Sequence, residues 1–357
     1  MTDPAPPRLR VDEFDYDLPI GAVAQTPAEP RDASRLLVLD RAASRPGEPA
    51  LTQARFAAIG GWLRPGDLLV VNDSRVLRAR LRGQRAGGGA AEVLLLRPLA
   101  DHRWEALVRP SRRLRNGATV RLSTGDELVI GERAGEGTRV VQLPREAEAV
   151  MAAAGEMPLP PYITARAAPD ERYQTVYAEP PGSAAAPTAG LHFTPSLLDE
   201  LAATRISRAT VTLHVGLDTF QPLEGSYIDE HRIHREWYIV PHATRTAIVA
   251  SKAAGNRVVA VGTTTTRVLE TLARTGDSDG WTDLYIQPPH RFRSVDALIT
   301  NFHLPRSSLL LLVTAFVQDG IPGTTPLEAR DTLLAAYCAA LESGYRFYSF
   351  GDAMLIL

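Results

Sequence analysis

The chain has 357 residues, of which 45% are hydrophobic and 22% are charged, so it can bury a sizeable core divided among two or three domains. No apolar run approaches the roughly 20 residues that span a bilayer, and the first ten residues lack the apolar stretch of a signal peptide. We therefore expect a cytoplasmic protein without a membrane segment. The single cysteine, Cys338, excludes an intramolecular disulfide and a thiolate metal cluster, and we expect it to pack as a small hydrophobic residue.

Two enzyme classes are disfavoured by the lysine and glycine patterns. Lys252 is the only lysine and lies in a polar, helix-like stretch, which is an unsuitable setting for a Schiff base. No Gly-Lys-Ser/Thr phosphate loop occurs, and no Gly-x-Gly-x-x-Gly follows a strand. Pyridoxal enzymes and P-loop NTPases are therefore not expected, and the usual methyltransferase or dinucleotide-binding signature is absent.

Positive charge is concentrated in one segment. The formal net charge is only −2, but residues 64–121 contain thirteen arginines against five acidic residues. A solvated surface produced by genomic codon bias accounts for this pattern, and so does a surface that faces phosphates. Both interpretations stay open at this point.

The first 144 residues change from an alternating pattern to closely spaced strands. Residues 35–40 and 67–71 are apolar runs of strand length, separated by a helix-like segment at 53–62. After Asn72, six short strands are predicted between glycine-rich turns, at 76–82, 91–97, 104–108, 119–122, 127–130 and 138–142. This spacing is typical of a small antiparallel β-barrel.

Helices and strands alternate again in the rest of the chain. Helices are expected at 145–154, 195–204, 243–254, 265–273, 307–317 and 327–342, and strands at 209–214, 257–261, 281–287, 297–300 and 353–357. The proline- and glycine-rich segment 179–186 is predicted to be a mobile loop beside the site. We infer an α/β domain formed by residues 1–73 and 145–357, interrupted by an arginine-rich β-barrel at 74–144.

The run Pro187-Thr188-Ala189-Gly190-Leu191-His192-Phe193 is the first candidate site. It combines a restrained turn, a hydroxyl, a glycine that permits close backbone approach, an imidazole and an aromatic ring, just before a helix. Such a loop can hold a polar ligand. A structural loop with a capping Thr194 and a hydrogen-bonded core histidine fits the same residues.

Three further motifs place polar residues where predicted strands end. They are His214 in residues 211–216, the threonines of Gly262-Thr263-Thr264-Thr265-Thr266-Arg267, and Asn301-Phe302-His303-Leu304-Pro305. In open α/β sheets ligands gather at the carboxyl ends of strands, and a helix start can receive a carboxylate or phosphate. Packing and helix capping explain each motif equally well when it is considered alone.

His231 and His234 lie among carboxylates and suggest a metal site only at first sight. A His-x-x-His pair is less well placed on one helix face than His-x-x-x-His, and no thiolate is available. We expect no metal and interpret His234 as a contact to a ligand or to RNA.

Taken in order, the motifs resemble one family, the S-adenosylmethionine:tRNA ribosyltransferase-isomerases of queuosine biosynthesis. The resemblance extends from about Val11 to Ile356. It is carried by residues 72–76, 157–163, 172–177, 185–193, 212–216, 219–222, 262–267, 301–305 and 350–354.

The resemblance implies an enzyme that transfers and isomerises the ribosyl group of S-adenosylmethionine. The acceptor is 7-aminomethyl-7-deazaguanine in tRNA, the product is epoxyqueuosine, and adenine and methionine leave. S-adenosylmethionine is then a substrate, no other cofactor is expected, and the protein is a monomer or weak oligomer. An α/β domain with an inserted barrel is also implied.

The resemblance assigns roles to particular residues. The catalytic candidates are His192, His214 and Thr188: the histidines would transfer protons, because histidine titrates near neutral pH, and Thr188 would orient ligand hydroxyls. Thr219 and Asn301 would orient hydroxyls, Phe193 and Phe220 would stack on a base, and Thr263, Thr264 and Thr265 would hold the methionine carboxylate. The remaining implied substrate contacts are Asn72, Arg75, Tyr162, Gly190, Asp218, His234 and His303.

Three alternatives stay open. Asp218, which stands where many members carry a small glycine-containing turn, contacts a cationic amine or sulfonium, or forms an Asx-turn. In the second alternative, the acceptor is a small deazapurine or nucleoside instead of tRNA. In the third, the protein binds RNA without catalysis. Salt-dependent tRNA binding and adenine release separate the last two possibilities from the main one.

Overall fold

The computed structural model describes residues 8–135, 137–165, 168–216 and 223–357. Asp218, Thr219 and Phe220 lie outside the described residues. Contacts divide the chain into two compact units. The α/β unit comprises Met1–Asp73, Pro161–Glu179 and Pro187–Leu357, and the barrel unit comprises Ser74–Pro160 and Pro180–Ala186.

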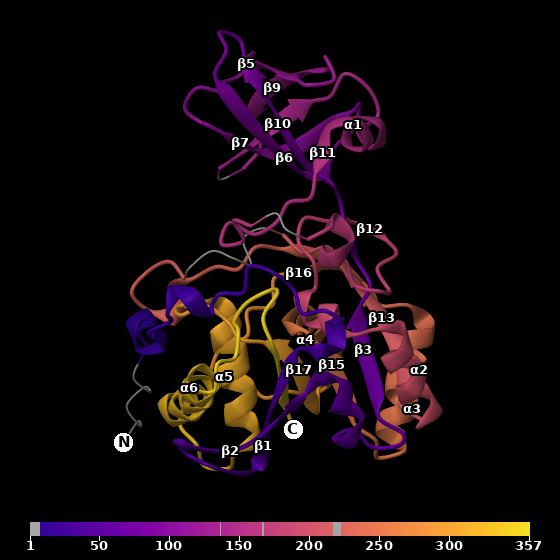
Figure 1. Cartoon of the computed structure of the whole chain (residues 1–357), viewed down its shortest axis with the longest axis vertical. Helices are drawn as coiled ribbons and strands as arrows, with labels where there is room; N and C mark the ends of the chain where they lie inside the picture. Colours follow the sequence, from indigo (N-terminus) through magenta and orange to yellow (C-terminus); the bar gives the residue numbers. More distant parts are fainter. Residues whose placement is uncertain (1–7, 136, 166–167, 217–222) are drawn as a thin grey trace. The chain divides into compact units, whose positions relative to one another are not determined.

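A nine-stranded mixed sheet forms the α/β unit (Figure 1). Its strands lie in the order β16 (Asp279–Thr282), β14 (Glu236–Ile239), β13 (Ser207–Leu213), β3 (Leu68–Asn72), β15 (Val258–Val261), β17 (Ala297–Asn301), β18 (Ala353–Ile356), β1 (Arg35–Arg45) and β2 (Glu48–Arg55).

Four adjacent strands at the centre of this sheet, β13, β3, β15 and β17, run parallel to one another. Strands β3 and β15 are buried at every residue, which is why both read as uninterrupted apolar runs. Strand β18 is antiparallel to β17, so its amino end lies at the edge where the four parallel strands end. Strand β1 is parallel to β18 and begins at that same edge.

Helices cover the sheet on both faces. They are α2 (Pro195–Ala203), α3 (His242–Ala253), α4 (Thr263–Thr275), α5 (Ser308–Gly320) and α6 (Pro326–Glu342). Helix α2 contacts β13, α3 and α4 each contact β13, β3 and β15, and α5 packs on α6 (Figure 1). Three helix starts are fixed by side-chain caps, in which the hydroxyls of Thr194, Ser307 and Thr325 accept backbone N–H bonds.

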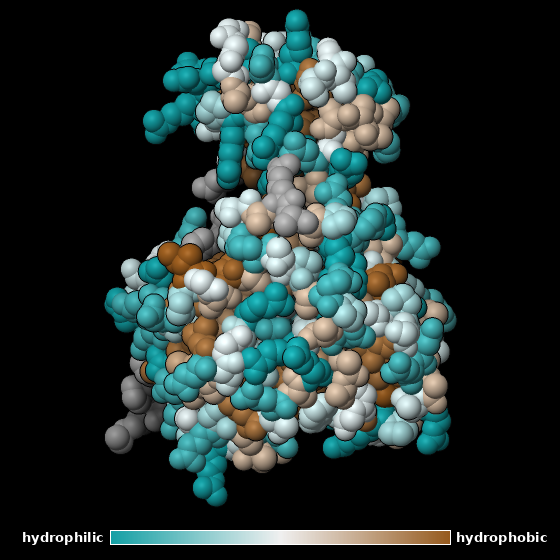
Figure 2. Space-filling view, viewed as in Figure 1, coloured by the Kyte–Doolittle hydropathy of each residue, from teal (hydrophilic) through white to brown (hydrophobic). Residues whose placement is uncertain are grey.

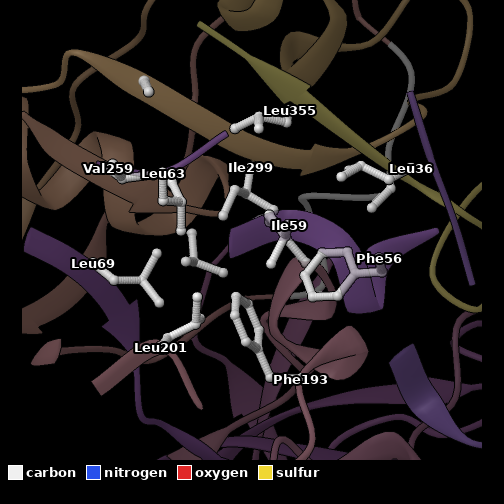
Figure 3. Packing of buried hydrophobic residues seen from close by; sticks show 14 of the residues in the cluster. Leu36, Phe56, Ile59, Leu63, Leu69, Phe193, Leu201, Val259, Ile299 and Leu355 are labelled. Atoms are coloured by element: carbon white, nitrogen blue, oxygen red, sulfur yellow. The ribbon is translucent and has the colours of Figure 1, made fainter. Parts of the chain in front are cut away.

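One face of the sheet packs against α2 and two 3-10 helices, η4 (Phe56–Gly61) and η6 (Thr188–His192). Alternate residues of five strands contribute, as the two-residue period of a strand requires. Figure 3 shows Phe193 beside Phe56 and Leu201 in this cluster, and the two phenylalanine rings meet edge to face with centroids 4.9 Å apart. Helices α3 to α6 contribute no residue to this cluster. The segment before α2 is therefore anchored to the sheet by its aromatic residue.

The barrel unit is a six-stranded antiparallel sheet closed on itself. Strands β5 (Arg80–Arg85), β6 (Ala90–Pro98), β7 (Arg103–Arg109), β10 (Thr138–Gln142), β9 (Glu127–Arg133) and β8 (Thr119–Leu122) pair in this order, and β8 pairs with β5 to close it. Gly83 lies in β5, where a side chain would overlap the Arg121 carbonyl group. Helix α1 (Ala147–Ala154) and β11 (Gly155–Glu156) pack on β5. The surface of this unit is largely hydrophilic on the face in view (Figure 2).

The predicted fold class, an α/β domain with a small antiparallel barrel, is confirmed, whereas four local expectations differ from the structure. Most of the segment expected to be helical at 53–62 forms the end of β2 and η4, because β2 pairs with β1. Strand β16 ends at Thr282, and its partner β14 was not predicted. In the segment 179–186, Pro181–Ser183 forms β12, which pairs with β4 (Arg75–Val76), and Ala184–Ala186 are buried. Cys338 is exposed and not packed.

The unit boundaries also fall at other residues than the sequence pattern indicates. The expected barrel ended at residue 144, whereas the barrel unit continues to Pro160 and includes residues 180–186. Pairing explains the difference, since β11 adds to β5, and β12 adds to β4.

We predict that Phe193→Ala lowers the free energy of unfolding of the α/β unit by about 3–5 kcal/mol, because Phe193 is 0% exposed and its removal leaves a cavity. Ile20→Ala is the control, since Ile20 is 93% exposed. Urea unfolding of both variants checks this, and equal stability of the two would contradict it.

Candidate active site

Polar motifs that are far apart in the sequence meet at one edge of the sheet. Strands β13, β3, β15 and β17 are parallel, so the residues that follow them, His214, Asp73, Gly262 and Phe302, lie along the edge formed by their carboxyl ends. Helix η6 joins them, because a side chain at Gly262 would touch the Ala189 methyl group at 3.6 Å. This edge is the position where α/β sheets bind ligands.

His192 is held by hydrogen bonds at both ring nitrogens. Its Nδ1 lies 2.8 Å from the Ser34 hydroxyl, and its Nε2 lies 3.2 Å from Asn301 Nδ2. The Thr188 hydroxyl donates to Asn301 Oδ1 at 3.0 Å, and Asn301 Nδ2 also donates to the Tyr348 carbonyl at 3.3 Å. Residues from η6, β17 and the segments before β1 and β18 therefore form one network.

These bonds determine the tautomer of His192. A carbonyl oxygen only accepts, so the bond to Tyr348 fixes which end of the Asn301 amide carries the nitrogen. His192 Nε2 must then accept, and the ring proton lies on Nδ1 and is donated to Ser34. Burial, followed by the charges of nearby arginines, lowers the pKa of His192 to about 3. The ring, which is only 4% exposed, is therefore neutral at physiological pH.

An aromatic wall adjoins this network. The Tyr162 and Tyr348 ring centroids lie 4.6 Å apart, and the Tyr162 hydroxyl is 2.6 Å from the Ser349 hydroxyl. Burial raises the pKa of Tyr162 well above its ordinary value. Tyr348 has a φ of 70°, a left-handed conformation that aims its carbonyl group at Asn301. Tyr162 therefore packs against the residue whose carbonyl group accepts from Asn301.

A second polar cluster lies at the ends of β3 and β13. Asn72 Nδ2 donates to the Leu213 carbonyl at 3.1 Å, and the Leu213 N–H donates to Asn72 Oδ1 at 3.1 Å. Asn72 Nδ2 also lies 3.4 Å from Thr264 Oγ1. The Thr212 hydroxyl donates to Asp73 at 2.7 Å. The amide of Asn72 thus connects β13 to the start of α4.

His214 differs from His192 in its surroundings. It is half-buried, and none of the described residues forms a hydrogen bond with its imidazole. Burial lowers its pKa, while the carboxylate of Asp73 acts in the opposite direction. His214 is therefore a neutral imidazole without a hydrogen-bond partner in the described part of the chain.

The threonines at the start of α4 have two kinds of environment. Thr265 and Thr266 donate their hydroxyls to backbone carbonyls of the preceding turn, at 2.7 and 3.1 Å. Thr263 and Thr264 lie in the first turn, where backbone N–H groups have no partners within the helix. Gly262 adopts a φ of 91°, which lets β15 turn directly into the helix.

A buried ion pair supports the end of β13. Arg267 of α4 and Glu236 of β14 are almost fully buried and bonded to each other, and Glu236 also accepts the Gly216 N–H at 2.8 Å. Arg267 Nε donates to the Leu284 carbonyl at 3.1 Å. The pair therefore fixes the backbone that follows His214.

Other predicted site residues lie elsewhere or have structural partners. Phe193 is fully buried in the hydrophobic cluster that covers one face of the sheet (Figure 3). His303 is buried, with Nε2 2.8 Å from the Thr300 hydroxyl, and burial lowers its pKa to about 3. Arg75 belongs to the barrel unit. His234 is exposed just before β14.

Gly190 is required by close packing. A methyl group at this position would overlap the Tyr177 hydroxyl and approach the Thr175 side chain to 2.8 Å. Glycine is therefore the residue that lets η6 pass beside Tyr177.

Sequence reasoning missed Ser34, Tyr348 and Ser349. They precede β1 and β18, and their proximity to η6 depends on strand pairing that local pattern does not reveal. Asp73 stood beside Asn72 in a motif already identified, so its position was available. The described residues contain no cluster of three metal-ligating side chains, and no helix among them is long and apolar enough to span a membrane.

Comparisons with known proteins agree along the whole chain. A family model described as queuosine biosynthesis protein matches residues 11–356. The chain is 50% identical to the S-adenosylmethionine:tRNA ribosyltransferase-isomerase of Moorella thermoacetica, over 98% of this chain and 100% of that protein. It is also 50% identical to the protein of that name from Gloeobacter violaceus, over 97% of this chain and 95% of that protein.

A solved structure is similar as well. The crystal structure of S-adenosylmethionine tRNA ribosyltransferase from Thermotoga maritima matches with a TM-score of 0.54 and 38% identity, covering 97% of this chain and 100% of that chain.

The buried histidines predict how stability depends on pH. His192 and His303 stay neutral in the fold down to about pH 3, whereas in the unfolded chain they take up protons below about 6.5. Stability should therefore fall as the pH drops below 6.5, by about 2 kcal/mol for each histidine between pH 7 and pH 5. We expect His303→Gln to show a pH dependence about 2 kcal/mol smaller than wild type in urea unfolding at these two pH values. An unchanged pH dependence would contradict the neutral buried state.

Proposed function

The chain is a member of the queuosine biosynthesis family, and we propose that it transfers and isomerises the ribosyl group of S-adenosylmethionine onto 7-aminomethyl-7-deazaguanine in tRNA. Epoxyqueuosine forms, and adenine and methionine are released. The observation that carries this proposal is 50% identity, over nearly the full length, to relatives named for this activity. S-adenosylmethionine is a substrate, and the reaction needs no further cofactor. We propose a cytoplasmic location for this activity.

The reaction sets three requirements for proton transfer. The sulfonium acidifies the adjacent C5′ proton, so a base must accept it. Adenine needs a proton as it leaves the sugar, and the acceptor amine must be neutral when it attacks. The site must also hold the ribose hydroxyls and the methionine carboxylate.

We assign the proton acceptor to His214. It lies at the carboxyl end of β13, its lowered pKa keeps the ring neutral, and no described residue occupies its nitrogens. Asp73, which acts on it electrostatically, would stabilise the imidazolium formed after proton transfer.

We assign a positioning role to His192, because both of its ring nitrogens are already bonded. His192 holds the amide of Asn301, and Thr188 holds the other end of that amide. Asn301 and Thr188 would then present their remaining hydrogen-bonding capacity to ribose hydroxyls. Tyr162 and Tyr348 supply aromatic surface beside them.

The first turn of α4 suits the methionine carboxylate. The backbone N–H groups and hydroxyls of Thr263 and Thr264 lie there, and the positive end of the helix dipole favours an anion. The contact between Asn72 and Thr264 would connect this end of the ligand to the β13 side of the site.

The activity is tested by incubating the protein with S-adenosylmethionine and tRNA that carries 7-aminomethyl-7-deazaguanine. Mass analysis of the nucleosides should detect epoxyqueuosine, with adenine released in equal amount. Unmodified tRNA is the control and should give neither. Conversion of the free deazapurine but not of the tRNA would identify the small-acceptor alternative, and tRNA binding without adenine release would identify a non-catalytic protein.

The two histidines should respond differently to substitution. We expect His214→Gln to reduce kcat by about 10²- to 10⁴-fold, the range typical for loss of a general base, with S-adenosylmethionine affinity preserved. The pH dependence of kcat should also lose the limb that belongs to the base. Near-wild-type turnover would eliminate His214 as the proton acceptor.

A double-mutant cycle tests whether His192 acts by positioning Asn301. If His192 acts by holding Asn301, the kcat of His192→Gln/Asn301→Ala should equal that of Asn301→Ala alone, because the two changes remove the same interaction. Multiplicative losses would show that His192 acts independently of Asn301. Thermal unfolding of each variant separates these effects from loss of folded protein.

A further inference from the structure

The connection between β7 and β8 carries four arginines within seven residues. This segment, Arg109–Arg115, is called the arginine loop here and contains Arg109, Arg112, Arg113 and Arg115. All four side chains are exposed, and within the described chain none of them forms an ion pair. The loop therefore presents a local positive charge that no described carboxylate neutralises.

Four other exposed arginines of the barrel unit are paired with carboxylates, whereas the exposed Arg133 of β9 forms no ion pair with a described residue. Arg97 lies 2.8 Å from Glu105, Arg121 lies 3.5 Å from Glu127, and Arg145 lies 2.7 Å from Asp126. Arg82 lies 3.3 Å from Glu156 and 3.7 Å from Glu92. An arginine-rich surface produced by codon bias alone gives no reason for four unpaired arginines to lie within seven residues of one loop.

The backbone of the arginine loop is fixed, although its side chains reach into solvent. Leu114 is fully buried in the barrel unit and anchors the loop from below. The N–H groups of Arg113 and Leu114 both donate to the Pro110 carbonyl, at 3.1 and 3.2 Å. After the loop, Gly117 N–H donates to the Ile130 carbonyl at 2.8 Å. The arginines are thus presented on a preformed turn, which reduces the entropy lost on binding.

We propose that the arginine loop binds the phosphate backbone of the tRNA substrate, and this inference rests on the proposed function. Guanidinium groups match phosphate oxygens with two parallel hydrogen bonds and remain charged at any physiological pH. Exposed on a turn, they do not enclose a single small anion. A chain of phosphates engages several of them at once and releases counterions, which is the main source of affinity for nucleic acids.

The test compares two triple variants that carry the same change in formal charge. Arg112→Gln/Arg113→Gln/Arg115→Gln removes charge from the arginine loop, and Arg82→Gln/Arg97→Gln/Arg121→Gln removes paired arginines from the same unit. Affinity for the acceptor tRNA is measured as a function of salt concentration. The kcat at saturating tRNA and the affinity for S-adenosylmethionine are measured as well.

The loop variant should bind tRNA about 10- to 100-fold more weakly near 0.1 M salt, and the slope of log affinity against log salt should fall by about two to three. Its kcat and its affinity for S-adenosylmethionine should stay within about twofold of wild type. The paired-arginine variant should lose less affinity and keep most of the slope.

Unchanged tRNA affinity of the loop variant overturns the inference, and so does an equal loss in both variants, which would reflect overall charge alone. Circular dichroism confirms that the variants are folded. A failure of the proposed function looks different from a failure of this inference. In that case the wild-type protein itself would bind S-adenosylmethionine or tRNA without forming epoxyqueuosine.

Discussion

The parallel pairing of β13, β3, β15 and β17 is the constraint on which the rest of the structure depends. Parallel strands buried on both faces require a helical or looped return outside the sheet, so each strand ends at one common edge. That edge collects side chains separated by up to about 230 residues, from Asn72 to Asn301. Four adjacent parallel strands therefore bring together a polar site from segments whose proximity cannot be predicted from their local sequences.

Two different environments arise along this edge. At the β17 end, His192 has a partner at each nitrogen and a strongly lowered pKa, so it acts through the orientation it imposes. At the β13 end, His214 keeps its nitrogens unbonded by described residues and lies under the influence of Asp73. In our proposal, one histidine thus holds a neighbouring side chain in place, and the other accepts a proton.

Local sequence patterns predicted the elements that carry their own signal. The apolar runs of β3 and β15, the capped helix at Thr194 and the six closely spaced barrel strands were all predictable, because burial and turn chemistry act over a few residues. Strand β14 and the pairing of β2 with β1 were not, since strands at or next to the edge of a sheet depend on their neighbours for their conformation. Phe193 shows the corresponding limit for the site, because a buried ring and a ligand-facing ring have the same local sequence. Ser34 and Tyr348 reach His192 only through tertiary pairing.

The points at which the chain passes between its two units restrict where another protein module could be grafted into the chain. The chain leaves the α/β unit after Asp73, directly behind Asn72, and returns for the last time at Pro187, directly before Thr188. Both junctions adjoin residues of the polar edge, so a module inserted at either one would displace the backbone that carries them. Tolerant positions for such grafts lie away from these two junctions, in exposed turns of the barrel unit other than the arginine loop.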